Sequence, residues 1–202
     1  MKTFTLNDVA DVAEILNSGG VVVIPTDTVY GVAARVADAD AVARLFQVKR
    51  RPADVALPVF VENLEGVVDA GGRLPASAQT LAHAFWPGAM TLVIPAVASM
   101  AARVGSREPT IGFRLPDDDF VQELVVRTGP LAVTSANSHG EPPCTTFDAV
   151  VAGFSDSSGV DALVDGGERG GAVSTVIKCN ESGYEILREG ALSPEQIGAA
   201  FR

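Results

Sequence analysis

The chain has 202 residues, a mass of 20.9 kDa and 47% hydrophobic residues, which suits one large domain over residues 1–202 with a core of its own. No apolar run approaches the roughly 20 residues of a membrane-spanning helix, and the amino terminus lacks the apolar stretch of a signal peptide, so we expect a cytoplasmic protein with no membrane contact. The formal net charge of -10 repels polyanions, which favours a small-molecule substrate and leaves at most a weak, local contact with RNA.

The first predicted elements are an amphipathic helix and a buried strand. Thr5 and Asp8 have the spacing of a capping box, and apolar residues from Val9 to Leu16 follow helical periodicity until Gly19. Val21–Pro25 is then a β-branched run without polar alternation, as expected for a strand that is buried on both faces of a sheet. The polar residues that follow this strand are Thr26, Asp27, Thr28 and Tyr30.

The next predicted element is a helix from Ala39 to Lys49. Val42, Leu45 and Phe46 form one apolar stripe along it, and Lys49 falls on the same stripe. A charged residue is therefore expected on the apolar side of this helix.

Strand and helix patterns alternate through the rest of the chain. Further strands are predicted at Leu57–Val61, Met90–Ile94, Thr110–Leu115, Leu131–Ser135, Val160–Val164, Ser174–Lys178 and Tyr184–Arg188. Helices are predicted near Ser77–Phe85, Asp118–Arg127 and Phe147–Phe154, and a last short helix starts with Ser193 as its cap and Pro194 in its first turn. This alternation predicts a mixed α/β domain in which helices cover a sheet.

A basic run, Lys49, Arg50 and Arg51, closes the second helix and is followed by Pro52, which fixes where that helix stops. These cations suit a triphosphate. Helix carboxyl ends also attract Lys and Arg through the macrodipole without any ligand, so both interpretations stay open for the run itself.

Arg114 is the charged residue of an otherwise uncharged strand. Alternation along Thr110–Leu115 places Thr110, Gly112 and Arg114 on one face and the larger apolar residues on the other. A buried Arg needs a carboxylate or phosphate partner, because burying it unpaired is expensive. The pattern favours a ligand-binding role, although a structural Asp would serve equally well.

The segment Leu131–Asn137 is an apolar strand that breaks into Thr134, Ser135, Ala136 and Asn137, which leaves polar donors where a sheet strand ends. Ligands of α/β sheets commonly bind at such ends, whereas a simple turn explains the same residues on local grounds. Ser174 and Arg188 likewise read as an ordinary strand residue and an ordinary surface charge.

Several familiar sites are excluded. Cys144 and Cys179 lie far apart, and His83 and His139 are isolated, so neither a disulfide framework nor a protein-ligated metal site is indicated. The glycine-rich stretch from Gly166 to Gly171 matches no phosphate-binding loop, dinucleotide fingerprint or nucleophile elbow.

Taken together, seven ordered segments over nearly the whole chain resemble the YrdC family, the threonylcarbamoyl-AMP synthases. These segments are GGVVVIPTDTVYGVAA (19–34), KRRP (49–52), WPGAMTLVI (86–94), TIGFRLP (110–116), PLAVTSAN (130–137), STVI (174–177) and ILREGALS (186–193). The resemblance implies a twisted mixed β-sheet flanked by helices, with a concave, positively lined cavity.

The resemblance also implies which residues form the site. It assigns catalysis to Lys49 and Arg51. ATP contacts would come from Lys49, Arg51, Thr110, Thr134, Ser135, Ala136 (through its backbone), Asn137 and Arg188. Threonine contacts would come from Thr26, Tyr30, Arg114 and Ser174.

The implied reaction joins L-threonine and bicarbonate into a carbamate, whose carboxylate attacks the α-phosphorus of ATP and releases pyrophosphate, with Mg²⁺ accompanying ATP. The chain resembles the short, single-domain form, which hands its product to a tRNA-modifying transfer complex.

Two positions depart from the family pattern. Val55 stands near a position where Lys is common, and His139 replaces a small hydroxyl residue.

Three alternatives stay open at this point. A YrdC-like paralogue would adenylate a carbamoyl group instead of using threonine, and a non-enzymatic module would bind RNA in the same cavity. An inactive paralogue is the third. The threonine assignment requires Thr26, Tyr30, Arg114 and Ser174 to converge on one pocket beside Lys49.

Overall fold

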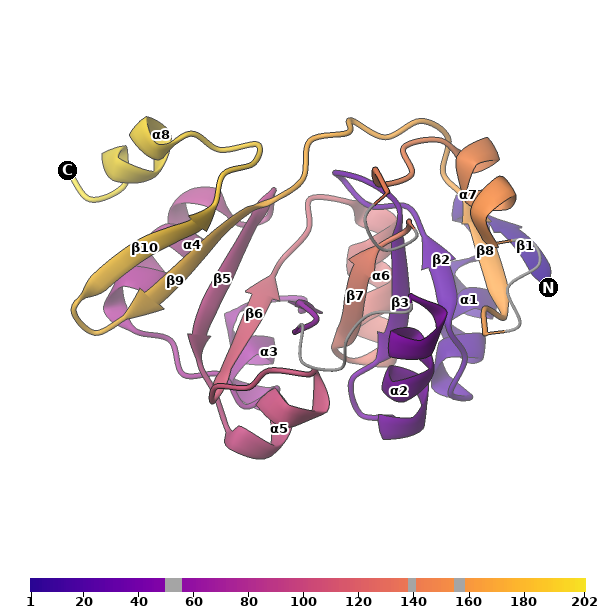
Figure 1. Cartoon of the computed structure of the whole chain (residues 1–202), viewed down its shortest axis with the longest axis horizontal. Helices are drawn as coiled ribbons and strands as arrows, with labels where there is room; N and C mark the ends of the chain where they lie inside the picture. The colour runs from indigo at the N-terminus through magenta and orange to yellow at the C-terminus, as the bar shows by residue number, and fades with distance from the viewer. Residues whose placement is uncertain (50–55, 138–140, 155–158) are drawn as a thin grey trace.

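Figure 1 shows the computed structural model, which describes residues 1–49, 56–137, 141–154 and 159–202. The strands are β1 (Lys2–Thr5), β2 (Val22–Ile24), β3 (Gly31–Arg35), β4 (Val59–Phe60), β5 (Met90–Pro95), β6 (Thr110–Arg114), β7 (Leu131–Ser135), β8 (Ala162–Asp165), β9 (Thr175–Asn180) and β10 (Gly183–Arg188). The helices are η1 (Leu6–Asp8), α1 (Val9–Asn17), α2 (Ala39–Val48), α3 (Leu64–Asp69), α4 (Ala76–Phe85), α5 (Ala98–Arg103), α6 (Asp119–Thr128), α7 (Phe147–Phe154) and α8 (Pro194–Ala199).

All these strands belong to one twisted, mixed 10-stranded sheet with the order β1-β8-β2-β3-β7-β4-β6-β5-β9-β10. Four pairs are parallel (β1 with β8, β8 with β2, β4 with β6, β5 with β9), and the other neighbouring pairs are antiparallel. The short strand β4 joins the two halves, since it pairs with β7 on one side and β6 on the other. The mixed α/β fold predicted from the sequence is therefore confirmed.

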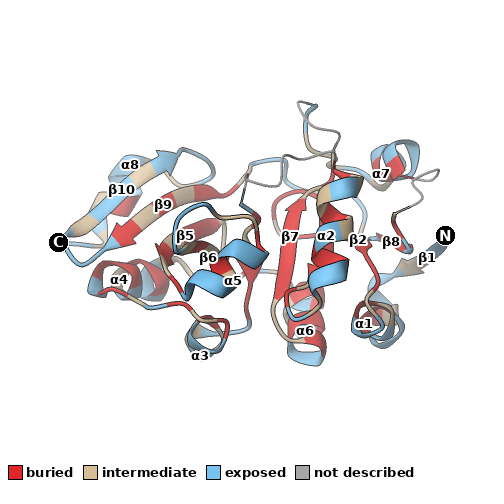
Figure 2. Ribbon diagram, turned by 60° about the horizontal axis from the view of Figure 1, so that its bottom comes forward, coloured by how far each residue is buried: buried red, intermediate tan, exposed pale blue. Residues whose placement is uncertain are grey.

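The sheet separates two hydrophobic clusters, and strand β2 together with the preceding Val21 contributes to both. Val21 and Val23 pack into the larger cluster with residues of α2, α4, α5 and α7, while Val22 and Ile24 pack against α1 and α6. The prediction that this strand is buried on both faces is thus confirmed. In Figure 2 the central strands are buried, whereas helices α2 and α6 keep exposed outer faces.

The strand register brings distant segments of the chain to the two sides of β7. The connection over residues 25–30 follows β2, and Gly31 at its end pairs with Ser135 at the end of β7. On the other side of β7, Phe60 of β4 pairs with Leu131 at the start of β7 and with Arg114 of β6. Segments that are far apart in sequence thus meet on the two sides of β7.

Most predicted elements are confirmed with small shifts of their bounds, and four elements had not been predicted. The capping box of Thr5 and Asp8 is present but caps the short helix η1, from which α1 continues. The unpredicted elements are β1, β3, α3 and α5. Within the described residues no helix is long and apolar enough to cross a membrane.

Candidate active site

A cavity of about 250 Å³ lies where these segments meet. Its wall includes the four residues predicted to bind threonine, Thr26, Tyr30, Arg114 and Ser174. Four of the residues predicted to bind ATP also line it, namely Thr134, Ser135, Asn137 and Arg188. The convergence that the threonine assignment requires is therefore present.

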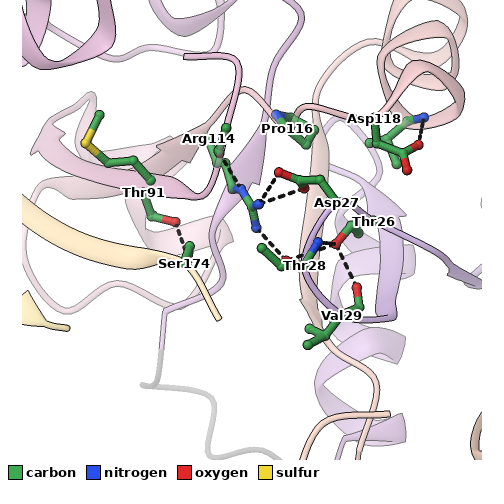
Figure 3. Close-up of polar contacts among 12 residues, drawn as sticks. Thr26, Asp27, Thr28, Val29, Thr91, Arg114, Pro116, Asp118 and Ser174 are labelled. Carbon is green, nitrogen blue, oxygen red and sulfur yellow. Dashed lines mark hydrogen bonds and ion pairs between the residues drawn. The ribbon is translucent and has the colours of Figure 1, made fainter. Parts of the chain in front are cut away.

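Arg114 lines this cavity and is only 4% exposed, and Figure 3 shows its polar contacts. Its Nη2 donates to both carboxylate oxygens of Asp27, each at 2.7 Å, its Nη1 donates to Thr28 Oγ1 (3.0 Å), and its Nε donates to the Gly88 carbonyl oxygen (3.1 Å). The guanidinium also lies over the Phe60 ring, with Cζ 5.6 Å from the ring centroid. Burial lowers the pKa of Arg114 from its ordinary value, and the Asp27 carboxylate opposes this effect.

The turn after β2 is held by its own hydroxyl groups. Thr26 Oγ1 donates to the Val29 carbonyl oxygen (2.7 Å) and accepts from the Thr28 amide (3.2 Å), and the Thr26 and Thr28 hydroxyls are 3.1 Å apart. Hydrogen bonds from hydroxyl groups to the backbone of the same segment stabilise a turn relative to an extended conformation. The turn thereby presents Thr26 to the cavity and Asp27 to Arg114 (Figure 3).

Tyr30 closes the same wall, although its hydroxyl is already engaged. The hydroxyl donates to the Gly167 carbonyl oxygen (2.7 Å) and accepts from the Gly166 amide (3.0 Å). Burial raises the pKa of the Tyr30 hydroxyl above its ordinary value, so the group remains a donor at neutral pH. Tyr30 thus ties the glycine-rich connection to the cavity wall.

Ser174 and Arg188 form the opposite wall. Ser174 Oγ lies 3.0 Å from Thr91 Oγ1, and Arg188 Nη2 donates to the Ser174 carbonyl oxygen (2.7 Å) and to Ser174 Oγ (3.2 Å). Arg188 is therefore oriented by Ser174 and brings a second cation to the cavity.

Lys49 lies behind the end of β7 and is 4% exposed, as its position on the apolar stripe of α2 predicts. Its Nζ donates to the Ser135 carbonyl oxygen (2.5 Å), to the Asn137 carbonyl oxygen and to Asn137 Oδ1 (2.7 Å). The Ser135 hydroxyl also donates to Asn137 Oδ1 (2.7 Å). The structure therefore joins Lys49 to the Ser135–Asn137 segment, and that segment lines the cavity.

Thr110, Ala136 and Arg51 differ from the other predicted site residues. Thr110 lines a neighbouring cavity of about 230 Å³, which shares Thr91, Ser174 and Arg188 with the first one. The Ala136 amide donates to the Tyr30 carbonyl oxygen (2.7 Å), and its carbonyl accepts from the Cys144 amide (2.8 Å). Both groups are thus engaged within the protein, although a carbonyl oxygen can accept a second hydrogen bond, and the ATP contact predicted for the Ala136 backbone stays a prediction.

Arg51, Val55 and His139 lie outside the described residues. The catalytic role predicted for Arg51 and the two departures from the family pattern stay predictions.

Sequence reasoning did not assign Asp27, Thr28 and Thr91 to the site. Asp27 and Thr28 stand beside Thr26 in the same polar turn, which was the available signal. Thr91 sits within a predicted strand, and no local pattern marks it. Thr91 comes close to Ser174 because β5 and β9 pair in parallel, with Met90 opposite Thr175.

The cavity combines the buried cation of Arg114 and the more exposed cation of Arg188 with hydroxyl and amide groups, which suits the binding of anionic ligands. Arg114 is matched by one carboxylate, whereas Arg188 is held by neutral oxygens of Ser174. Within the described residues, no group of three or more His, Cys, Asp or Glu side chains could hold a metal ion.

The chain is similar to known proteins in sequence and in fold. The family model for Sua5/YciO/YrdC, described as telomere recombination, matches residues 14–190. A Bacillus subtilis protein named threonylcarbamoyl-AMP synthase is 36% identical over 96% of this chain and 56% of its own length. A Mycobacterium leprae protein named putative threonylcarbamoyl-AMP synthase is 35% identical over 94% of this chain and 86% of its own length.

A solved structure is also similar. The crystal structure of P. abyssi Sua5 complexed with L-threonine superposes with a TM-score of 0.90 at 31% identity, and covers 98% of this chain and 60% of that one. The chain thus spans little more than half the length of the Bacillus protein and of Sua5.

Proposed function

The chain belongs to the Sua5/YciO/YrdC family, and we propose that it is an L-threonylcarbamoyladenylate synthase, a nucleotidyltransferase that uses ATP, bicarbonate and L-threonine. The observation that carries this proposal is the convergence of Thr26, Arg114 and Ser174 on one cavity beside the segment that Lys49 holds. The L-threonine named in the P. abyssi Sua5 structure supports the choice of amino acid.

In this proposal the amine of threonine and bicarbonate form a carbamate with loss of water. A carbamate oxygen then attacks the α-phosphorus of ATP, the bond between that phosphorus and the bridging oxygen breaks, and pyrophosphate leaves. The protein needs no nucleophile of its own, so its task is to hold two anions in line and to stabilise the charge that develops.

The residues divide this task between the two sides of the cavity. Arg114 is placed to attract the carboxylate of threonine, with Thr26, Tyr30 and Ser174 around it. On the nucleotide side we assign Lys49, Thr110, Thr134, Ser135, Asn137 and Arg188, together with the predicted Arg51. Mg²⁺ enters with ATP as part of the substrate and neutralises charge on the triphosphate.

The product is an activated acyl adenylate, which we expect to pass to a tRNA-modifying transfer complex. Direct contact with RNA would be weak, because the net charge of -10 opposes it. The cytoplasmic location and the extent of the single domain stay predictions.

Pyrophosphate release from ATP with Mg²⁺ and bicarbonate, measured with and without L-threonine, tests the proposal. We expect release that requires threonine and that falls about 30- to 1,000-fold in Lys49→Ala, as for the loss of one preorganised cation. Lys178→Ala is the matched control, since Lys178 forms an exposed pair with Glu108.

The other outcomes separate the alternatives. Release that is indifferent to threonine would favour a carbamoyl-adenylating paralogue. RNA binding with a steep salt dependence and no turnover would favour a binding module. Thermal melting of both variants distinguishes lost chemistry from lost folding, because Lys49 also holds the Ser135–Asn137 segment.

A further inference from the structure

The connection between β8 and β9 contains a glycine-rich strap, defined as residues 166–171. Figure 1 shows this connection crossing from the half of the sheet that contains β8 to the half that contains β9. Gly167 and Gly171 have positive φ angles of 72° and 79°, which favour glycine. A glycine-rich segment loses much backbone entropy when it is ordered, so its fixed position requires specific anchors.

Two sets of backbone bonds attach the strap to the threonine side of the cavity. Gly166 and Gly167 bind the Tyr30 hydroxyl at 3.0 and 2.7 Å, and the Gly171 amide donates to the Thr28 carbonyl oxygen (3.0 Å). Thr28 and Tyr30 both line the cavity. Any movement of the strap would therefore be transmitted to this wall.

Arg169 is the charged residue in the middle of the strap. Its backbone amide donates to the Thr145 carbonyl oxygen (2.7 Å), its Nη1 donates to Asp118 Oδ2 (3.1 Å), and its Nη2 donates to the Gly166 carbonyl oxygen. The side chains of Arg169 and Asp118 are only 15% and 11% exposed, in contrast to the surface pair of Arg127 and Glu123 at 46% and 50%. Such a sheltered pair is screened less by salt than an exposed one.

Asp118 in turn fixes the start of helix α6. Its Oδ1 accepts from the Val121 amide (3.0 Å) as the helix cap, while its Oδ2 binds Arg169. One carboxylate thus joins the strap to a helix of the core.

We propose that Arg169 is a positioning residue that latches the glycine-rich strap onto helix α6 and thereby holds the Thr28–Tyr30 wall for the amino acid substrate. The inference rests on the proposed function for its choice of substrate. Arg169 touches no reacting atom and acts through Gly166, Gly167 and Tyr30.

The first measurement is hydrogen–deuterium exchange in wild-type protein, Arg169→Ala and the control Arg127→Ala. Loss of the latch should raise exchange in peptides that cover 166–171 and 28–30, whereas Arg127→Ala should leave both unchanged. Asp118→Asn keeps the helix cap, because Asn caps as well as Asp, but it weakens the bond to Arg169. It should raise exchange less than Arg169→Ala does.

The second measurement is the dependence of pyrophosphate release on L-threonine. In Arg169→Ala we expect KM for threonine to rise about tenfold with kcat changed less than about threefold, as for a disturbed binding wall. Arg169→Lys should recover part of the loss, because Lys restores the charge but not the planar fork. The double variant Arg169→Ala with Asp118→Asn should raise KM for threonine little more than Arg169→Ala alone, since the two residues act as one unit.

If hydrogen–deuterium exchange of residues 166–171 and 28–30 is unchanged in Arg169→Ala, the proposal that Arg169 holds the strap on α6 is wrong. A fall in thermal stability with KM for threonine unaltered would also overturn it, since a merely structural role predicts that result. If wild-type protein shows no threonine-dependent release, the proposed function fails, and the exchange measurement by itself decides the latch.

Discussion

At the scale of single residues, the ion pair of Asp27 and Arg114 partly neutralises the buried positive charge in the cavity wall. Both side chains are largely buried, with 10% and 5% exposure, and one guanidinium nitrogen, Nη2, donates to both carboxylate oxygens. The alternatives left open by the sequence are therefore not exclusive, because Arg114 has a structural Asp and also lines the cavity. Asp27 fixes the plane of the cation before any substrate arrives.

Replacing Asp27 with Ala should lower the free energy of unfolding by about 3–5 kcal/mol, because it leaves a buried cation unpaired. Glu123→Ala removes the carboxylate of the exposed pair with Arg127 and should cost about 0–1 kcal/mol. Urea unfolding of both variants measures the difference. Equal, small losses would mean that Arg114 finds water or another partner when Asp27 is absent.

At the scale of secondary-structure elements, the sequence predicted best where a pattern is local. The alternation of Thr110–Arg114 is confirmed, since Ile111 and Phe113 are buried in the core while Thr110, Gly112 and Arg114 line the two cavities. The burial of Lys49 follows from helical periodicity in the same way.

Local sequence patterns could not predict which distant segments pair with each other. Asp27 and Arg114 are 87 positions apart in the sequence, and their contact depends on the order of strands in the sheet, where β7 and β4 stand between β3 and β6. Strand β3 was missed because its sequence, GVAAR, is mostly small residues without alternation. Edge strand β1 was missed because its residues are largely exposed and its stability comes from pairing with β8.

The loop after β10 gives a test at this scale, because Gly190 packs directly on the backbone that positions Ser174. A Cβ atom at Gly190 would lie 2.4 Å from the Val173 carbonyl oxygen and 2.6 Å from the Ser174 carbonyl carbon. Gly190→Ala should therefore lower stability by about 1–3 kcal/mol through overpacking. It should also weaken threonine binding, since Val173 and Ser174 line the cavity.

Gly153→Ala is the matched control for that change. Gly153 lies in helix α7, and apart from its chain neighbours and its own helix backbone nothing lies within 4 Å of the place that a Cβ would occupy. Ala there should raise stability by about 0.5–1 kcal/mol. Thermal melting and calorimetric titration with L-threonine measure both effects. If threonine affinity is unchanged in Gly190→Ala, the loop after β10 changes its conformation to accept the methyl group and Ser174 does not move.

At the scale of the whole molecule, an acidic protein places three cations at one cavity. The net charge is -10, yet Arg114 and Arg188 line the cavity and Lys49 lies behind its wall. This distribution attracts small anions locally while the molecule as a whole repels polyanions. It suits an enzyme that binds ATP and hands its product to other proteins that bind tRNA.

Removal of Mg²⁺ with EDTA tests how the triphosphate charge is neutralised in this molecule. We expect EDTA to stop pyrophosphate release and to leave the melting temperature of the ATP-free protein unchanged, because the described residues offer no cluster of metal ligands. A resident ion would couple its binding to folding, so its removal would lower the melting temperature. Release that survives EDTA would instead mean that the protein's own cations, with Arg188 in the cavity wall, suffice to stabilise the departing pyrophosphate.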